Sequence, residues 1–277
     1  MATLVCFHAH PDDESISTGG VMALAASAGH RVVLVVATDG RHGERPEGVD
    51  SPEALVERRR AETEASAAAL GIHRVAWLGY HDSGMTGWEH NDHPSSFHRA
   101  ALEDAAARLA AILVEETADV VTVYDWHGNY GHPDHVKVHH VGHRAAVLAG
   151  TGAVYEATMN RDHMRRLMAM QRELLGTGSD AAGSDGTEGD RGFDVDGPAD
   201  DGNPFGMPEA ELTTMVDVRA ALVAKRASMA CHRSQITDTS LFLEMPDEAF
   251  AVAFGTEWFI RRGAPAGIHE HGLAGLW

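Results

Sequence analysis

Short apolar runs alternate with longer helical stretches along the first half of the chain, and this rhythm limits the folds open to it. The run RVVLVVAT at 31–38 is continuous and rich in valine, which is typical of a parallel strand buried on both faces. The stretch that follows has helical composition, with Ser51 and Pro52 as cap and first residue and Gly71 at its end. Repeated units of this kind predict an α/β fold with a doubly wound, mostly parallel sheet flanked by helices.

The same alternation of apolar runs and helical stretches predicts the remaining strands and helices. Strands are expected at 3–7, 31–38, 74–80, 119–125 and 153–159. Helices are expected at 15–28, 51–71, 97–116 and 132–150. We therefore expect residues 1–175 to form a Rossmann-like catalytic core and residues 206–277 to form a smaller C-terminal α+β portion that completes the pocket.

Residues 176–205 break this pattern because they are rich in glycine, aspartate and serine and nearly devoid of apolar side chains. Such a segment cannot bury enough surface to offset its ordering entropy, so we expect a mobile acidic loop. It is either a tolerated surface insertion or a lid over the pocket. The segment also adds to the formal charge of −19 on the 277-residue chain, which argues against nucleic acid as a partner.

The remaining composition predicts a cytoplasmic protein without a membrane partner. No apolar stretch approaches the roughly 20 residues that span a bilayer, and the opening MATLVCF is too short for a secretory signal. Cys6 and Cys231 lie far apart in apolar or helical patterns, so they indicate neither a disulfide framework nor cysteine ligands for zinc.

Polar clusters follow four of the predicted strands, at the point where each strand ends. They are HAHPDDES at 8–15, TDGRHGE at 38–44, GYHDSGM at 79–85 and YDWHGNYGHPDH at 124–135. In open parallel sheets the carboxyl ends of the strands meet at one edge, and ligands bind there. The four clusters are therefore expected to form a single site.

Two imidazoles and one carboxylate, His10, His135 and Asp13, are available to this site. That donor set is common in catalytic zinc centres, where the fourth position is left for water. It is equally the facial triad of non-haem iron sites, so Fe²⁺ or another divalent ion stays open. Asp12 is adjacent to Asp13 and should point another way, free to take a proton from the activated water.

His132 precedes His135 by three residues in GHPDH, where Pro133 suits the first turn of a helix. The two histidines would then share a helix face, so His132 can face the metal without binding it. A histidine there could stabilise the oxyanion of a tetrahedral intermediate and protonate the leaving amine. Asp134 could orient an imidazole, as carboxylates beside metal ligands do.

The pair HPDDE and HPDH resembles the LmbE-like, or PIG-L, family of zinc-dependent de-N-acetylases, which hydrolyse N-acetyl groups on glucosamine-containing small molecules. The resemblance covers most of the chain except the acidic loop. The segments ERRRAETEASAAALGI, WLGYHDSGM, NPFGMPEAELTTMVDV and KRASMACHRSQI are similar to the actinobacterial thiol branch, meaning the mycothiol-pathway deacetylase and the mycothiol S-conjugate amidase.

This resemblance implies roles for individual residues. It implies Zn²⁺ held by His10, Asp13 and His135, with Asp12 as general base. It also implies His132 as acid or oxyanion stabiliser, with Asp134 hydrogen-bonded to it, and Tyr130 polarising the scissile carbonyl. Packing of the Tyr130 ring over the site is the alternative.

The resemblance further implies substrate contacts by Ser17, Glu44, Arg59 and Asp82. Arg59 lies in a run of three arginines, so a solvated helix face is an alternative interpretation. Polar loop residues without a ligand are the alternative for Glu44 and Asp82. His232 in CHRSQ has either a role at the substrate mouth or none.

Function is therefore expected to be metal-dependent hydrolysis of an N-acyl, most simply N-acetyl, amide on a small amino-sugar substrate. Mycothiol S-conjugate amidase is the alternative within the same chemistry. A non-hydrolytic Rossmann-like binder is the alternative outside it, but no GxGxxG follows the first strand. His139, His140 and His143 are expected to belong to a packed or solvated helix and not to a metal site.

Overall fold

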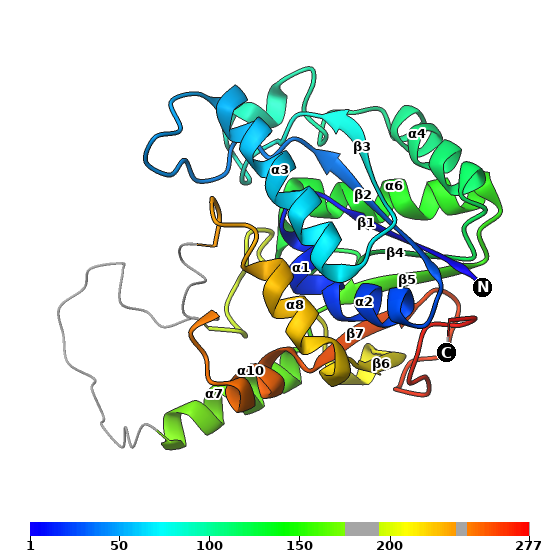
Figure 1. Cartoon of the computed structure of the whole chain (residues 1–277), viewed down its shortest axis with the longest axis vertical. Coiled ribbons are helices and arrows are strands. Elements are labelled where there is room, and N and C mark those ends of the chain that lie inside the picture. Colours follow the sequence, from blue (N-terminus) through cyan, green and yellow to red (C-terminus); the bar gives the residue numbers. More distant parts are fainter. Residues whose placement is uncertain (175–193, 237–242, 277) are drawn as a thin grey trace.

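The structure, a computed structural model, describes residues 1–174, 194–236 and 243–276. Within these residues one seven-stranded sheet runs through the molecule in the order β3-β2-β1-β4-β5-β7-β6 (Figure 1). The strands are β1 (Thr3–His8), β2 (Arg31–Thr38), β3 (Arg74–Tyr80), β4 (Val120–Tyr124), β5 (Ala153–Thr158), β6 (Thr214–Asp217) and β7 (Thr256–Arg261). Strands β1 to β5 are parallel, whereas β7 is antiparallel to both β5 and β6.

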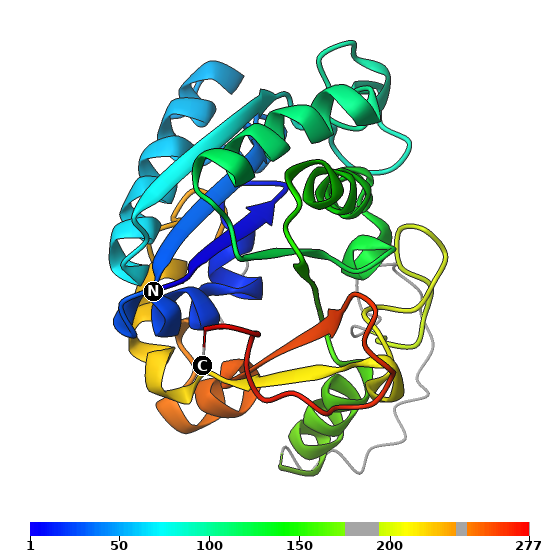
Figure 2. The same cartoon turned by 90° about the vertical axis from the view of Figure 1, so that its right-hand side faces the viewer.

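Helices cover both faces of the sheet, as Figure 2 shows, which confirms the predicted fold class. The helices are α1 (Asp13–Ser17), α2 (Gly19–Ser27), α3 (Pro52–Leu70), α4 (Leu102–Glu115), α5 (Gly128–Gly131), α6 (Pro133–Ala149), α7 (Arg161–Leu174), α8 (Leu222–Met229) and α10 (Asp247–Phe254). Short 3₁₀ turns lie at Glu89–Asp92, Glu209–Glu211 and Arg219–Ala221. Helices α4 and α6 pack together on one face, and α2, α3 and α8 pack together on the other.

Local sequence signals set both ends of α3. The Ser51 side chain accepts a hydrogen bond from the backbone N of Ala54 at 3.1 Å, and Gly71 closes α3 at a φ of 75°. The predicted helix at 15–28 is instead divided at Thr18 into α1 and α2. The predicted helix at 97–116 starts only at Leu102, because the preceding residues form turns that bury the Phe97 ring in the core.

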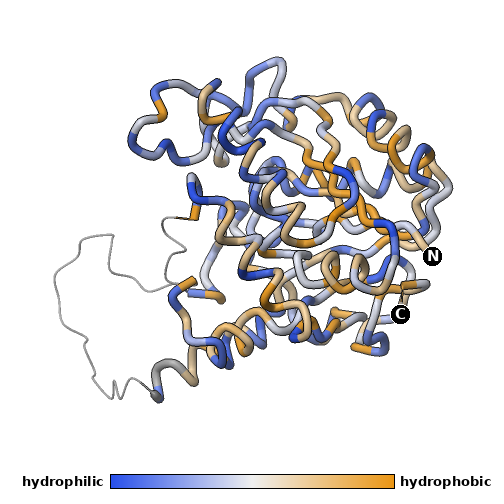
Figure 3. Tube along the Cα trace, in the orientation of Figure 1, coloured by the Kyte–Doolittle hydropathy of each residue, from blue (hydrophilic) through white to orange (hydrophobic). Residues whose placement is uncertain are grey.

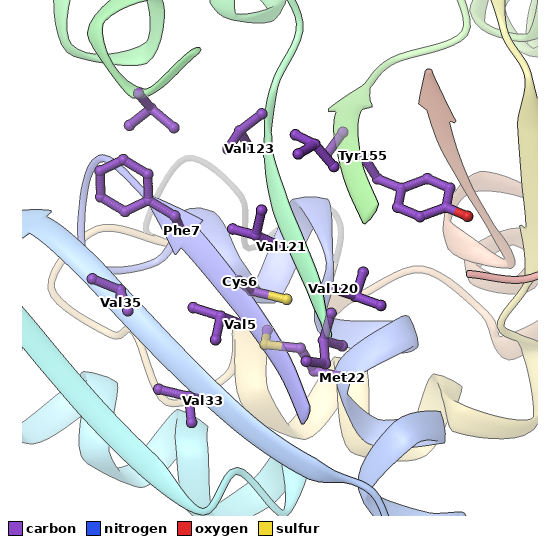
Figure 4. Close-up of a cluster of buried hydrophobic side chains, with 14 of the residues drawn as sticks. Val5, Cys6, Phe7, Met22, Val33, Val35, Val120, Val121, Val123 and Tyr155 are labelled. Carbon is purple, nitrogen blue, oxygen red and sulfur yellow. The ribbon is translucent and has the colours of Figure 1, made fainter. Parts of the chain in front are cut away.

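The core lies along the inner strands and the helix faces packed on them (Figures 3 and 4). Figure 4 shows Val5, Phe7, Val121 and Val123 of β1 and β4 among its side chains. Cys6 is also buried here, and burial raises the pKa of its thiol to about 12. Cys6 and Cys231 are both free thiols.

The C-terminal residues extend the same sheet. Strands β6 and β7 form its far edge, and their Val216 and Phe259 belong to the same core cluster as β1. Of the predicted acidic loop, residues 176–193 lie outside the described residues, while 194–205 form turns beside the end of β4. Among the described helices, none has the length and apolarity needed to span a membrane.

Candidate active site

The loops after β1, β3 and β4 bring five of the predicted site residues together at the carboxyl edge of the sheet. The His10 ring centroid lies 4.6 Å from that of His132 and 5.2 Å from that of His135. Asp82 and Asp134 approach the same His10 ring from β3 and α6. These five residues therefore lie together at one edge of the sheet.

Three donor atoms form a nearly equilateral triangle at this edge. Nδ1 of His10 lies 3.4 Å from Oδ2 of Asp13, which lies 3.5 Å from Nε2 of His135. The two ring nitrogens are 3.3 Å apart. Bonds of about 2.1 Å at tetrahedral angles place donor atoms about 3.4 Å apart, so this triangle has the dimensions of a zinc site.

In both His10 and His135, the ring nitrogen outside the triangle has a partner of its own. Nδ1 of His135 lies 3.2 Å from the carbonyl oxygen of Gly128, so it carries the proton. Nε2 of His10 faces carboxylate oxygens of Asp134 at 3.3 Å and Asp82 at 3.5 Å. With the ring protons on these outer nitrogens, the inward nitrogens would be left to bind a metal ion, as in metal-ligating histidines that a carbonyl or carboxylate orients.

The charges around His10 also favour a cation at this point. Burial lowers the pKa of His10, but the carboxylates of Asp82, Asp13 and Asp134 outweigh burial and raise it well above its usual range. Burial holds the pKa of His135 down at about 4, so that ring is neutral. A divalent ion bound by His10, Asp13 and His135 would supply the positive charge that these carboxylates select.

His132 stands beside this triangle with one nitrogen already engaged. Its Nδ1 accepts a hydrogen bond from the backbone N of Asp134 at 3.1 Å, so the neutral ring carries its proton on Nε2. Burial, together with His10 and His135, lowers the pKa of His132 to about 3. His132 can thus serve as a neutral hydrogen-bond donor, although its ring nitrogen also falls within 4.8 Å of those of His10 and His135.

The expected hydrogen bond between Asp134 and His132 is donated by the backbone N of Asp134, whereas the Asp134 carboxylate has other partners. It accepts hydrogen bonds from the backbone N and the hydroxyl of Ser83, at 2.9 and 2.5 Å, and faces His10. Asp134 thus contacts two imidazoles, that of His10 through its carboxylate and that of His132 through its backbone N. Ser83 was missed by the sequence reasoning, although it lies in the GYHDSGM cluster.

Asp12 is held in an unusual backbone conformation next to Asp13, with a φ of 111°. Its Oδ2 accepts a hydrogen bond from Nη2 of Arg59 at 3.1 Å. Burial raises the pKa of Asp12 to about 6, while Arg59 opposes the shift. A carboxylate beside the triangle that is not one of its three donors is suited to proton transfer.

Tyr130 is fixed over the site by the described end of the acidic segment. Its ring stacks on Phe205 with centroids 5.6 Å apart and lies 5.0 Å from the His135 ring. The carbonyl oxygen of Tyr130 accepts a hydrogen bond from the backbone N of Asp200 at 2.9 Å. Burial and the Asp13 carboxylate raise the pKa of Tyr130, so its hydroxyl stays protonated. Phe205 was not predicted as a site residue.

A cavity of about 290 Å³ opens beside the triangle, and apolar side chains supply most of its wall. Asp13, Ser17, Tyr130 and His135 are part of its lining. The rest of the lining is Ile16, Asn129, Thr158, Met159, Asn160, His163, Met164, Phe205, Lys225, Ala253, Phe254, Thr256, Glu257 and Trp258. Ser17 is therefore the one predicted substrate contact within this cavity among the described residues.

The other three predicted substrate contacts lie elsewhere. Arg59 is only 3% exposed, and its guanidinium donates to the carbonyl oxygens of Gly40 and Pro11 as well as to Asp12. The alternative of a solvated helix face is thus wrong for Arg59. Asp82 is buried against His10, whereas Glu44 is exposed on the loop after β2.

Two further histidine groups are bound within the protein. His143 Nε2 lies 2.7 Å from Glu156 and His139 Nδ1 lies 3.0 Å from the carbonyl oxygen of Tyr124, which fits the expected packed helix. His139, His143 and Glu156 come within 4.8 Å of one another, but the His139 nitrogen nearest Glu156 gives its proton to Tyr124. His232 is fully buried against Glu14 and does not lie at the substrate mouth.

Comparison with known proteins agrees with this geometry. The GlcNAc-PI de-N-acetylase (PIG-L) family matches residues 5–146. A 1D-myo-inositol 2-acetamido-2-deoxy-alpha-D-glucopyranoside deacetylase from Thermomonospora curvata is 37% identical, with 94% of this chain and 90% of the relative covered. The enzyme of the same name from Acidothermus cellulolyticus is 38% identical, with 93% and 88% covered.

The fold has a solved counterpart as well. The N,N'-diacetylchitobiose deacetylase from Pyrococcus horikoshii superimposes with a TM-score of 0.58 at 22% identity, covering 94% of this chain and 83% of that one. That likeness concerns the arrangement of the sheet and helices, whereas the sequence matches reach the HPDDE and HPDH segments themselves. The chain belongs to the GlcNAc-PI de-N-acetylase (PIG-L) family.

Proposed function

We propose that this chain is a zinc-dependent deacetylase that removes the N-acetyl group from 1D-myo-inositol 2-acetamido-2-deoxy-alpha-D-glucopyranoside. The observation that carries the proposal is the triangle of lone-pair donors from His10, Asp13 and His135 with Asp12 beside it. The named relatives act on this amino sugar, and they match the chain over nearly its whole length.

Zinc bound by His10, Asp13 and His135 would act as a Lewis acid and lower the pKa of a water molecule toward about 7. Asp12 takes the proton of that water as it attacks the amide carbonyl. Arg59 holds one carboxylate oxygen of Asp12, which fixes the direction of the other. Fe²⁺ fits the same donors, so metal analysis of the purified protein decides between the two ions.

His132 and Tyr130 act on the other atoms of the amide. The Nε2–H of His132 stabilises the developing oxyanion by hydrogen bonding, and the Tyr130 hydroxyl is a second protonated donor at the cavity. The C–N bond then breaks, the glucosamine nitrogen takes the proton that Asp12 accepted from water, and acetate and free amine are released. Asp134 contributes indirectly, because it fixes the rings of both His10 and His132.

A substrate comparison tests the proposal. Zinc-loaded protein is assayed for amine release from the acetylated inositol glycoside, from free N-acetylglucosamine and from a mycothiol S-conjugate. We expect kcat/KM for the inositol glycoside to exceed that for free N-acetylglucosamine by about 100-fold, because the inositol supplies additional binding energy. A reaction without protein serves as the background control. No amine release from the inositol glycoside above that control would refute the proposal.

Amidase activity on thiol conjugates is a second candidate, and the cavity favours it. The cavity of about 290 Å³ starts at Asp13 and His135 and has mainly apolar walls, including Met164, Phe254 and Trp258. An acetyl group would fill only a small part of this space, whereas an acyl group carrying an apolar S-substituent could occupy it. A higher kcat/KM for the S-conjugate than for the acetylated glycoside would favour this second function.

A further inference from the structure

Glu14, the last residue of HPDDE, links the amino-terminal motif to a segment more than 200 residues away. Its carboxylate is fully buried. Oε1 accepts hydrogen bonds from the Ser66 hydroxyl at 2.5 Å and from Nε2 of His232 at 2.6 Å. Oε2 accepts one from the backbone N of Asp12 at 3.0 Å. One carboxylate thus connects α3 and the turn after α8 to the backbone of Asp12.

Asp12 needs such support because its backbone is strained. A φ of 111° and ψ of −31° lie outside the conformations that a residue with a side chain readily adopts. Its carbonyl oxygen is held by the backbone N and the hydroxyl of Ser15, at 3.0 and 2.7 Å. Its amide is held by Glu14. These hydrogen bonds on both sides maintain the conformation in which the Asp12 carboxylate reaches Arg59.

His232 is in turn fixed by the turn in which it lies. Its backbone N donates to the carbonyl oxygen of Met229, and its own carbonyl oxygen accepts from the backbone N of Gln235 and of Ile236. Next to it, Ser228 of α8 shares a 2.6 Å hydrogen bond with Ser66 of α3. The imidazole is fully buried, and its only side-chain partner among the described residues is Glu14.

We propose that His232 is a positioning residue that holds the general base Asp12 in place through Glu14. The inference rests on the proposed function, because that function assigns the base to Asp12. Neither His232 nor Glu14 lines the cavity, so neither is expected to contact the substrate. The oxygen of Asp13 that belongs to the donor triangle is held separately, by the backbone N of His10 at 2.8 Å. Loss of His232 should therefore disturb Asp12 and leave metal binding intact.

Two substitutions at His232 separate positioning from simple packing. His232→Leu removes the N–H that Glu14 accepts, whereas His232→Gln places a side-chain N–H near the former Nε2. In zinc-loaded protein acting on the acetylated inositol glycoside, we expect His232→Leu to lower kcat about 100-fold, the size of effect that a small misplacement of a reacting group produces. KM and the zinc content should stay at wild-type values. His232→Gln should recover kcat to within about 10-fold of wild type.

His143→Leu is the matched control, because it breaks a histidine–glutamate contact of 2.7 Å on α6 away from Asp12. Its kcat should equal that of wild type. If His232→Leu does not fold, Glu14→Gln tests the same link, because an amide cannot accept from both His232 and the Asp12 amide. It should show the same selective loss of kcat. A crystal structure of the variant used should show a displaced Asp12 carboxylate.

Wild-type kcat in His232→Leu, or zinc loss in parallel with the loss of activity, would overturn the positioning role. So would an undisplaced Asp12 in the variant structure. Wild-type protein that releases no amine from any of the tested substrates would instead refute the proposed function. The two failures are distinct, because the first appears only in the variants and the second already in the unaltered protein.

Discussion

Nε2 of His135 and Nδ1 of His10 face each other at 3.3 Å, and Asp13 places a carboxylate oxygen within 3.5 Å of both. Each ring is anchored through its other nitrogen, His135 by Gly128 and His10 by Asp134. Neither ring can therefore turn away without giving up a buried hydrogen bond. The arrangement is a preformed candidate site for one cation.

Removal of one of these donors should abolish metal binding and catalysis together. In Asp13→Ala we expect tightly bound zinc to be lost and kcat to fall by about 10³-fold or more, because Lewis acid and water activation are lost together. Metal analysis of purified protein and amine release give the two readouts. His143→Leu, outside the triangle, should keep one zinc per chain. An Asp13→Ala protein with full zinc content would show that Asp13 is not a ligand.

Replacement of the proposed general base, Asp12, should reduce catalysis without affecting metal binding. Asp12→Asn keeps the size of the side chain and its hydrogen bond to Arg59 but cannot accept the proton of water. We expect zinc content to stay at the wild-type value while kcat falls about 10²- to 10⁴-fold, the usual contribution of a general base. Near-normal turnover in this variant would assign proton transfer to another group.

If the cavity holds the acyl group of the substrate, filling it should reduce activity on a large acyl group more than on an acetyl group. Ala253 lines the cavity, whereas its neighbour Val252 is 48% exposed on α10. Ala253→Phe should fill part of the cavity and lower kcat/KM for an S-conjugate by about 10-fold or more, with a far smaller effect on the acetylated glycoside. Val252→Phe should affect neither. Equal losses on both substrates in Ala253→Phe would mean that the cavity holds the sugar portion.

We expect the ion pairs of Glu116, which follows the last residue of α4, to make the stability of the fold depend on pH. Hydrogen bonds from Arg31, together with Arg74, hold the pKa of Glu116 down at about 2, against the opposing effect of burial. A depressed carboxyl pKa stabilises the fold above the unfolded pKa, and this contribution is lost as the pH falls through the folded one. Glu116→Gln should therefore lower the free energy of unfolding at pH 7 by about 1–2 kcal/mol, given partial screening of the exposed arginines.

Urea unfolding at two pH values checks this. At pH 3 the difference between wild type and Glu116→Gln should shrink to less than half of its pH 7 value. Glu103→Gln, on the exposed pair with Arg144, should change stability little at either pH. A difference that is the same at both pH values would show that the Glu116 contribution does not come from its charge.

The strands and caps could be predicted because their signals are local. RVVLVVAT coincides with β2, and Ser51, Pro52 and Gly71 mark the ends of α3. The break of the first helix at Thr18 could not be predicted, because it depends on tertiary contacts such as the 2.8 Å hydrogen bond between the Thr18 hydroxyl and Nε2 of His8. The late start of α4 likewise depends on burial of Phe97, which composition does not reveal.

The site was predictable where residue type and strand end coincide, as for His10, Asp13 and His135. Their approach follows from the topology, because β1 and β4 are neighbours in the sheet. The contacts between Glu14 and His232 and between Tyr130 and Phe205 join segments far apart in sequence and carry no local pattern. The burial of Arg59 is also invisible in a run of three arginines, because only packing decides which one turns inward.

Reconstitution of metal-free protein tests the central claim most directly. The protein is stripped with a chelator and assayed for amine release from the acetylated inositol glycoside before and after addition of one equivalent of zinc. We predict that activity falls to background on stripping and returns with that single equivalent, with a rise in the thermal unfolding midpoint because the ion binds the folded state. Undiminished turnover by the verified metal-free protein would contradict the account.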